Sequence, residues 1–364
     1  MSAKTLLIAG ASGLVGSAAA RAFAAAGWRV LGVSRRPPPL QGVEHLALDL
    51  LDEAACRAMR PRFSDVTHLV FAALEEQPGL FPGWTDPALM ERNARMLRNL
   101  FEPLAESAPL EHVLLLQGTK AYGVHHPAVD RTTIRIPLRE REPRVEHPNF
   151  YWLQEDYLRG KQRDGKWGLT IFRPTVIYGD AAGVNMNPML PIAVWAVVQQ
   201  EAGEPLHFPG RGSGLAIQEA VDADLLARAL VWAAESPAAR DRTFNITNGD
   251  VFQWRWVWPA IADEFRLAPG EHRPQSLAEE LPRRRRDWAR AVERYGLVAP
   301  RDPVAFCGWN SIVYTDMLLA MRESPQPLLN STIALRQAGF HACMDTEDMF
   351  RSLIRRLRAK RLVP

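Results

Sequence analysis

The sequence predicts an α/β fold, in which a doubly wound parallel sheet is followed by a smaller, mostly helical C-terminal lobe. Apolar segments of strand length alternate with helical segments over the first half of the 364-residue chain. A glycine-rich turn joins the first strand to the first helix, and the pattern after residue 249 is mainly helical and rich in tryptophan. Continuous apolar strands that alternate with helices are typical of a parallel sheet covered on both faces.

The predicted elements follow one another in the order that such a sheet requires. We expect strands at residues 6–9, 29–34, 45–48, 67–73, 112–117, 169–172 and 243–246. We expect helices at residues 17–26, 52–59, 84–107, 150–160 and 221–234.

The turn after the first strand has the spacing G-x-x-G-x-x-G, formed by Gly10, Gly13 and Gly16. In a β-α-β unit, such glycines permit a tight corner, close approach of the backbone to a pyrophosphate, and close packing of the helix on the sheet. The N-terminus of the helix then presents free N–H groups and the positive end of its dipole to the phosphates. We therefore predict a Rossmann-type dinucleotide site here, which also includes Ser12, Leu14 and Val15.

The end of the second strand indicates which dinucleotide is bound. A site for NAD usually has an acidic residue there, about 20 residues after the glycines, that binds the ribose 2′-hydroxyl. This chain has Ser34, Arg35 and Arg36 instead. A guanidinium binds a phosphate bidentately and stays charged, so the prediction is NADP(H). The alternative is a solvated pair of arginines at the end of a strand.

Two further strand ends are expected to contact the cofactor. Asp49 and Leu50 follow the third strand, where a carboxylate commonly reaches the adenine edge, and Ala72 and Ala73 end the fourth, where small residues let the backbone approach. Acidic loop residues and small strand-end residues are also ordinary in proteins. The predicted NADP-binding domain spans residues 1–179 and is rejoined by 215–248. The predicted substrate-binding lobe comprises 180–214 and 249–364.

Composition excludes several classes of function. The net charge of +3 is close to balance, and the single basic run at 283–286 lies among acidic residues, so we expect neither a nucleic acid nor a membrane surface as partner. Cys56, Cys307 and Cys343 are too far apart for a disulfide framework or a metal cluster, and no metal is predicted. No signal peptide and no apolar stretch of membrane-spanning length is evident, which predicts a cytoplasmic protein.

Several motifs together resemble one enzyme family. They are Gly-Ala-Ser-Gly-Leu-Val-Gly at 10–16, Gln-Gly-Thr-Lys-Ala-Tyr-Gly at 117–123, Arg173-Pro174, and Ile-Tyr-Gly at 177–179. The chain resembles an extended short-chain dehydrogenase/reductase. That family has a Tyr-x-x-x-Lys pair, but the residue four positions after Tyr151 is Glu155. Tyr157 and Lys161 have the required spacing farther along the helix, where we expect them to be structural.

A narrower resemblance explains this departure. Lys120 stands at the end of the fifth strand, and residues 149–156 read N-F-Y-x-x-x-E-D. Both features resemble the progesterone 5β-reductase and iridoid synthase-like enone reductases, as do residues 35–37, 244–254 and 362–364. The chain departs from that group at Trp152, where a second tyrosine is frequent, and at 175–176, where Thr-Val replaces Gly-Asn.

The resemblance implies roles for individual residues. Tyr151 would donate a hydrogen bond to the substrate carbonyl oxygen, where negative charge develops after hydride reaches the β-carbon. Lys120 would stay cationic near the nicotinamide ribose and lower the pKa of Tyr151. The cofactor would also contact Gln117, Pro174, Thr175 and Val176. Tyr122 is expected to be structural, and His125 and His126 to lie on a loop.

Three functions follow from these observations. The leading one is an NADPH-dependent reductase of α,β-unsaturated carbonyl compounds, which would accept a broad range of apolar enones or enals as small-molecule substrates. The second is a carbonyl reductase, or an epimerase or dehydratase that acts on a sugar nucleotide. The third is a regulator that binds NADP without turnover, because a fold does not determine a function. A monomer and a homodimer both remain open.

Overall fold

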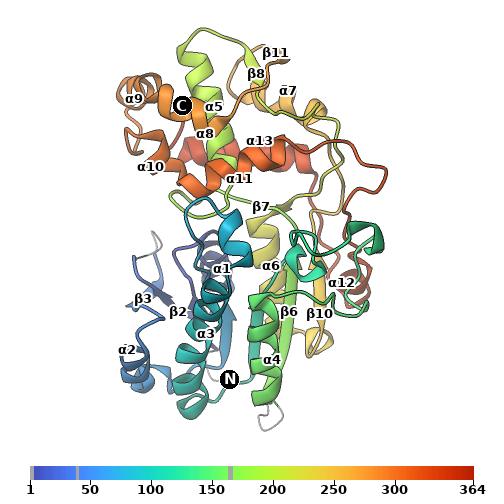
Figure 1. The fold of residues 1–364 in the computed structure, drawn as a ribbon. Coiled ribbons are helices and arrows are strands. Elements are labelled where there is room, and N and C mark those ends of the chain that lie inside the picture. The colour runs from blue at the N-terminus through green and yellow to red at the C-terminus, as the bar shows by residue number, and fades with distance from the viewer. Residues whose placement is uncertain (1–3, 38–40, 163–166) are drawn as a thin grey trace.

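The computed structural model describes residues 4–37, 41–162 and 167–364. Its centre is a sheet of seven parallel strands in the order β10-β6-β5-β4-β1-β2-β3 (Figure 1). The strands are β1 (Thr5–Ala9), β2 (Arg29–Ser34), β3 (Val43–Ala47), β4 (His68–Phe71), β5 (His112–Leu116), β6 (Gly168–Pro174) and β10 (Thr243–Ile246). The strand order reverses between β1 and β4, and this confirms the predicted doubly wound α/β sheet.

Helices cover both faces of this sheet because the strands are apolar on both sides. They are α1 (Leu14–Ala25), α2 (Glu53–Ala58), α3 (Pro87–Ser107), α4 (Phe150–Gln162) and α6 (Ala223–Glu235). Leu6 and Ile8 of β1 lie in one core cluster with α1 and α6. Leu7 and Ala9 lie in a second cluster, on the opposite face, with α3 and α4. Successive side chains of a strand alternate between faces, so the five residues of β1 contribute to both core clusters.

A helical C-terminal region lies beyond the carboxyl ends of the strands (Figure 1). Its helices are α5 (Met189–Glu201), α7 (Trp254–Glu264), α8 (Leu277–Arg283), α9 (Arg285–Arg294), α10 (Pro303–Cys307), α11 (Trp309–Leu319) and α13 (Thr346–Ala359). Two short parallel pairs accompany them, β7 (Ile177–Tyr178) with β9 (Val221–Asp222), and β8 (Leu206–Phe208) with β11 (Pro269–His272). The short helix α12 (Ile333–Gln337) packs beside β10.

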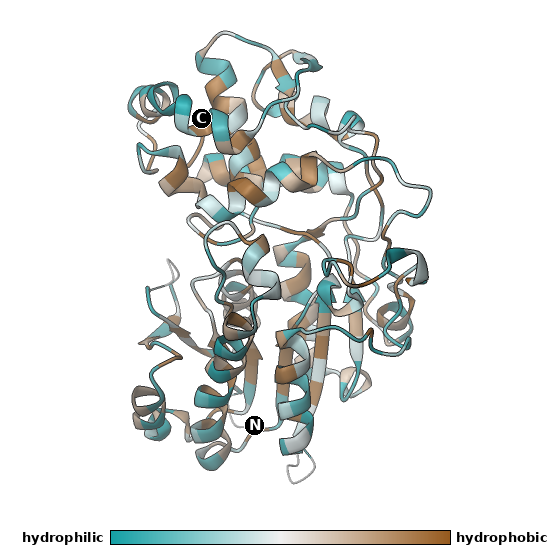
Figure 2. Ribbon diagram, viewed as in Figure 1, coloured by the Kyte–Doolittle hydropathy of each residue, from teal (hydrophilic) through white to brown (hydrophobic). Residues whose placement is uncertain are grey.

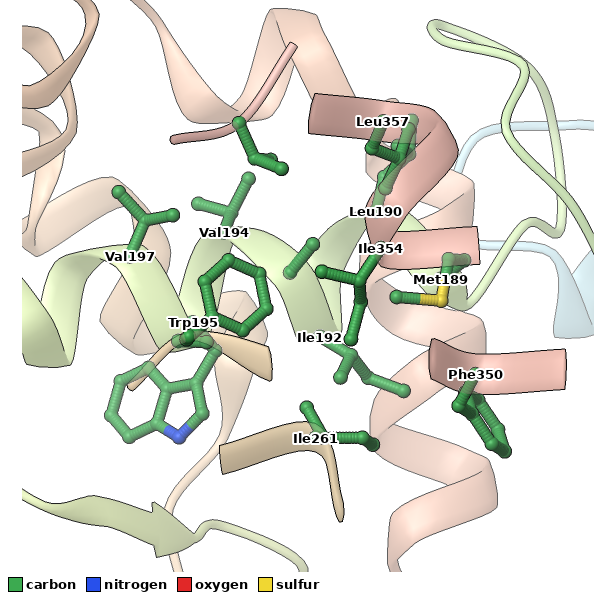
Figure 3. Close-up of a cluster of buried hydrophobic side chains, with 14 of the residues drawn as sticks. Met189, Leu190, Ile192, Val194, Trp195, Val197, Ile261, Phe350, Ile354 and Leu357 are labelled. Carbon is green, nitrogen blue, oxygen red and sulfur yellow. The ribbon is translucent and has the colours of Figure 1, made fainter. Parts of the chain in front are cut away.

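Helix α5 is the centre of this region. Its residues from Met189 to Gln199 are all buried, as expected for a helix that is apolar on every side. Trp195, Ile261 of α7 and Ile354 of α13 belong to the cluster around it (Figure 3). Helix α9, at the outer surface, is mostly hydrophilic (Figure 2). No helix among the described residues combines the length and the apolar character needed to cross a membrane.

The structure corrects several predicted boundaries. Helix α1 begins at Leu14 and not at residue 17, because Gly13 already serves as its N-cap. Helix α3 begins at Pro87 and not at 84, and a 3₁₀-helix, Phe81–Thr85, precedes it. Residues 221–222 were expected to be helical but pair with β7, after which Asp222 caps α6 with its side chain. A capping side chain starts the helix after itself, and this sets the boundary.

Candidate functional site

One cavity of about 1050 Å³ runs along the carboxyl ends of the strands, between the sheet and the C-terminal region. The segments that follow β1, β2, β3, β4, β5 and β6 all contribute to its lining. It therefore lies at the place where the strand order reverses, between β1 and β4. Ligands of open α/β sheets bind in this crevice.

The glycine turn is packed too tightly for side chains. Gly10 has φ +83°, and a Cβ there would lie 2.8 Å from the carbonyl oxygen of Ala72. A Cβ on Gly16 would lie 2.1 Å from the carbonyl oxygen of Gly10. No side chain caps α1, and its first turn holds no acidic residue, so its N–H groups are available to an anion at the cavity.

The structure brings nearly all of the predicted cofactor residues to this cavity. Those that line it are Gly10, Ser12, Gly13, Leu14, Val15, Ser34, Arg35, Arg36, Asp49, Leu50, Ala72, Ala73, Gln117, Lys120, Tyr151, Pro174, Thr175 and Val176. Gly16 lies outside the lining, and its role is the close packing of α1 on the turn.

The two arginines after β2 lie at the cavity and are not paired with a carboxylate anywhere in the described part of the chain. The Ser34 hydroxyl donates a 2.6 Å hydrogen bond to the carbonyl oxygen of Arg36, which folds the strand end into a turn. Among residues 34–37, the described part of this strand end, none is acidic. The residues present fit a dinucleotide, and the guanidinium groups fit one that carries a further phosphate.

Gln117 lines the cavity, and its side chain is also held by two buried partners. Its amide nitrogen donates to Glu155 at 2.8 Å, and its amide oxygen accepts from Arg173 at 2.9 Å. The Arg173 guanidinium also lies over the rings of Tyr122 and Trp152. The amide of Gln117 is therefore used to hold the end of β5 to α4 and β6.

Tyr151 lies in the first turn of α4 and is 8% exposed. The Asn149 side chain fixes the start of this helix, because Oδ1 accepts from the N–H of Tyr151 and Nδ2 donates to the carbonyl oxygen of Lys120. A Cβ on Gly118 would lie 3.1 Å from the Tyr151 hydroxyl oxygen, so a side chain there would require that oxygen to shift by a few tenths of an ångström. The hydroxyl makes no hydrogen bond to any other described residue.

The expected effect of Lys120 on Tyr151 is wrong. Burial raises the pKa of Tyr151, and the charge of Glu76 and the nearby Tyr314 raise it further. Lys120 is not among the groups that shift the pKa of Tyr151. Its Nζ lies 3.4 Å from Glu76 and 3.8 Å from the centre of the Trp84 ring. Burial lowers the pKa of Lys120 to about 8, against the opposing influence of Glu76.

Sequence reasoning missed three residues at this end of the cavity. Trp84 and Tyr314 line the cavity, and Glu76 lies behind Lys120, with its side chain 2% exposed. Tyr314 comes from α11, far along the chain. The only local signal was at 75–76, where two consecutive glutamates follow an apolar strand end.

The sequence of residues 6–247 matches the model of the NAD dependent epimerase/dehydratase family. The chain belongs to this family. It is 29% identical to an (S)-8-oxocitronellyl enol synthase of Camptotheca acuminata over 98% of this chain and 93% of that protein. It is 29% identical to a 3-oxo-Delta(4,5)-steroid 5-beta-reductase of Arabidopsis thaliana over 98% of this chain and 92% of that protein. The resemblance to extended short-chain dehydrogenases/reductases, and distantly to this enone reductase group, is confirmed.

Solved structures of the epimerase/dehydratase family share the fold. The UDP-glucose 4-epimerase of Thermus thermophilus, in complex with NAD, superposes with a TM-score of 0.65 at 16% identity. The match covers 97% of this chain and 99% of that one. At this identity the likeness concerns the fold alone.

The family's Tyr-x-x-x-Lys spacing occurs in this chain at a place away from the cavity. The Tyr157 hydroxyl donates to Glu102 at 2.7 Å, and Lys161 pairs with the same carboxylate. Neither residue is part of the cavity lining. Tyr122 is also tied down, since its hydroxyl donates to Asn245 at 2.6 Å.

The C-terminal region forms the other wall of the cavity, and this wall is mostly apolar. Its lining residues include Val184, Met186, Met317, Leu318, Met321 and Leu328. Glu219, from the segment before β9, is a buried charge in the cavity lining; both of its oxygens accept from the backbone N–H of Asn330, and burial raises its pKa to about 7. His125 lines the cavity too, and burial lowers its pKa to about 3.

Proposed function

We propose that this protein is an NADPH-dependent reductase of carbon–carbon double bonds conjugated to a carbonyl group. The observation that carries the proposal is the Tyr151 hydroxyl, which is buried, unpaired among the described residues and directed at the cavity beside Gly118. Lys120 lies just after the end of β5, at the same cavity. The chain is also 29% identical to relatives whose names describe an enol synthase and a steroid 5β-reductase.

The proposed cofactor is NADP(H). The open N-terminus of α1 and the glycine turn would hold the pyrophosphate, and Arg35 and Arg36 would hold the 2′-phosphate. The segments at 72–73 and 174–176 would lie along the rest of the cofactor. When bound, NADPH supplies the hydride that the β-carbon of the substrate accepts.

The chain's own residues would stabilise the charge that this transfer creates. Hydride addition at the β-carbon places negative charge on the carbonyl oxygen, and a proton from solvent later completes the reduction at the α-carbon. Tyr151 would donate a hydrogen bond to that oxygen. Because burial raises its pKa, the phenol stays protonated and remains a donor throughout the neutral range. Lys120 adds a positive charge at the same strand end.

We assign cofactor binding and substrate binding to different parts of the chain. Residues 1–179 and 215–248 would bind the cofactor, and residues 180–214 and 249–364 would bind the substrate. The apolar lining from α11 and its neighbours favours an apolar enone or enal over a sugar nucleotide, which requires polar partners for its hydroxyl and phosphate groups.

The test is to follow NADPH oxidation with cyclohexenone and a panel of longer enones and enals. Turnover is expected with wild-type protein. Tyr151→Phe should lower kcat/KM by about 10²–10³, with the affinity for NADPH unchanged, because one donor to the developing oxyanion is lost. Tyr157→Phe removes a phenol that lies outside the cavity and should leave turnover unchanged.

Other outcomes would favour the alternatives. Tight binding of NADPH without oxidation by any member of the panel would exclude the reductase and leave a cofactor-binding regulator. Reduction of simple ketones in place of enones would indicate a carbonyl reductase.

A further inference from the structure

Glu76 is a buried carboxylate to which the proposed reaction assigns no task. It lies in the loop after β4, its side chain is 2% exposed, and its Oε1 is 3.4 Å from Lys120 Nζ. A carboxylate is costly to bury unless a partner compensates its charge. Lys120 is the ion-pair partner of Glu76 in the described structure. The buried carboxylate of Glu76 and the ammonium of Lys120 therefore compensate each other's charge at the site.

The ammonium of Lys120 depends on Glu76 in turn. Burial opposes the charge on Lys120, and Glu76 is the one described group whose charge and hydrogen bond support it. The Trp84 ring, 3.8 Å from Nζ, adds a cation–π contact on the other side. Without the carboxylate, the ammonium would be left with the face of an indole ring.

A small cavity of about 10 Å³ adjoins the pair, with Glu76, Trp84, Lys120, His125 and Asn149 among its lining residues. His125 Nδ1 is buried there without a hydrogen-bond partner, and Trp84 Nε1, which lies near the Glu76 carboxylate, makes no hydrogen bond of good geometry. The volume is about that of one water molecule, and such polar atoms are the partners that a buried water requires. Lys120 borders this small cavity on one side and the large cavity on the other, and its side chain is 15% exposed.

The groups that face the pair come from several elements. They are Trp84 before α3, His125 and His147 beside the loop after β5, Tyr151 of α4 and Tyr314 of α11. His126 and Arg131 lie one step farther out and act on His125. The charge of Glu76 also acts on the two tyrosines near the pair, because it raises the pKa of Tyr151 and of Tyr314. One carboxylate thus favours both the ammonium of Lys120 and the protonated phenol of Tyr151.

We propose that Glu76 is a positioning residue, whose carboxylate keeps Lys120 protonated and holds its ammonium at the end of β5 beside Tyr151. That the Lys120 charge assists catalysis rests on the proposed function. The protonation state of Lys120 can nevertheless be measured without any turnover. Glu76 touches neither substrate nor cofactor in this role; it acts through Lys120.

The chain offers a direct measurement because it contains only five lysines. Protein labelled with ¹³C at lysine Cε gives one set of signals per lysine, and the signal lost in Lys120→Met identifies Lys120. In wild-type protein this signal should titrate near pH 8. In Glu76→Gln the titration should move down by about one to three pH units, because an opposite charge within 4 Å is removed and burial remains.

Two further variants accompany this experiment. Glu76→Asp keeps the charge on a shorter side chain and should return the Lys120 titration toward its wild-type position. Glu102→Gln removes the carboxylate of another Glu–Lys pair and should change the Lys161 signal only. A Lys120 titration in Glu76→Gln that coincides with that of wild-type protein would overturn the proposal. Should Glu76→Gln fail to fold, the comparison of Glu76→Asp with wild type decides, with a smaller downward shift expected.

Turnover provides the second readout. The alkaline limb of kcat/KM against pH should move by the same amount as the Lys120 signal. For a two-unit shift, the protonated fraction at pH 8 falls about fifty-fold, and the rate should fall with it. Absence of enone reduction in wild-type protein would refute the proposed function while the titration still decides the role of Glu76. An unmoved titration with normal turnover would refute the role of Glu76 alone.

Discussion

At the scale of single residues, the site is built from charges whose environments differ sharply. Arg35 and Arg36 are open to solvent at the cavity, without carboxylate partners among the described residues. Lys120 is nearly enclosed and depends on Glu76. Solvent-exposed guanidinium groups are available to a mobile ligand, whereas the enclosed ammonium is held in place before any ligand arrives. The first arrangement suits the proposed cofactor selection, and the second suits the proposed positioning of Lys120.

The exposed arginines yield a prediction about cofactor choice. Replacing either one, Arg35→Ala or Arg36→Ala, should weaken NADPH binding by about ten- to a hundredfold, since a hydrogen bond to a charged group contributes about 1.5–3 kcal/mol. Binding of NADH should change little, because it lacks the 2′-phosphate. Fluorescence titration of both cofactors measures this, with Arg57→Ala on α2 as the control. Equal weakening for both cofactors would contradict the assignment.

Tyr151 depends on a neighbour that has no side chain. A Cβ at Gly118 would lie 3.1 Å from the phenol oxygen and 3.5 Å from the carbonyl oxygen of Pro174. Gly118→Ala should therefore displace the hydroxyl and lower kcat for enone reduction by about tenfold to a hundredfold, because small displacements of a catalytic group are costly. Steady-state kinetics checks this, and thermal unfolding should show a folded protein. Unchanged kcat would show that the hydroxyl position tolerates the methyl group.

At the scale of elements, the contact between α1 and β1 decides whether an anion can reach the helix N-terminus. Gly16 lets the first turn of α1 lie directly on the backbone of Gly10, and Gly13 starts the helix immediately after the turn. This placement points the uncapped N–H groups of the first helical turn into the cavity. The same packing contributes Ala19, Ala20 and Phe23 to the core between α1 and α6.

A methyl group at this contact should separate helix from strand. In Gly16→Ala, the new Cβ meets backbone atoms of Gly10, which cannot rotate away. The expected result is destabilisation by about 1–3 kcal/mol, as for other overpacked cores, together with weaker NADPH binding. Urea unfolding and cofactor titration measure the two effects. Gly160→Ala is the matched control, because nothing lies within 4 Å of its Cβ position and alanine favours a helix; it should be neutral or stabilising.

At the scale of the whole molecule, distant segments meet through buried polar groups as well as through apolar cores. Arg356 of α13 pairs with Asp222 and Asp224 at the start of α6, which ties the C-terminal helix to the sheet layer. Glu219 accepts from the backbone N–H of Asn330 in the lining of the cavity. His68 and His112, at the amino ends of β4 and β5, are buried side by side.

The two histidines predict the response of stability to acid. Burial lowers the pKa of each to about 4, below the value of about 6.5 in an unfolded chain. The folded state therefore binds fewer protons, and stability should fall as the pH drops below 6.5, until the loss levels off below pH 4. Between pH 7 and 5 the loss should be on the order of 2 kcal/mol per imidazole. Urea unfolding at both pH values measures it.

The double variant His68→Gln/His112→Gln is the control for this prediction. Its side chains do not titrate, so its stability should depend less on pH over the same interval. A wild-type protein whose free energy of unfolding stays constant from pH 7 to 5 would contradict the assignment of these two groups.

Much of the fold and part of the site could be predicted from the sequence. The strand at 29–34 and the strand at 243–246 were predicted with their final bounds, because short apolar segments between polar turns are local signals. The start of α3 was placed too early, since the pattern of apolar residues continues through the 3₁₀-helix that contains Trp84. The role of Gln117 was missed because its partners Glu155 and Arg173 are distant in sequence.

The sequence by itself determined the glycine turn, the arginine pair after β2 and the succession of strands along the chain, because each depends on residues that are neighbours in the chain. Only the tertiary structure decided which charges are buried and what they face. Glu76 and Lys120 are 44 positions apart, and Tyr314 reaches the same cavity from α11. Burial and ion pairing set the pKa of a side chain, and both arise from packing between distant segments. The protonation of Lys120 and of Tyr151 is therefore set by the tertiary structure.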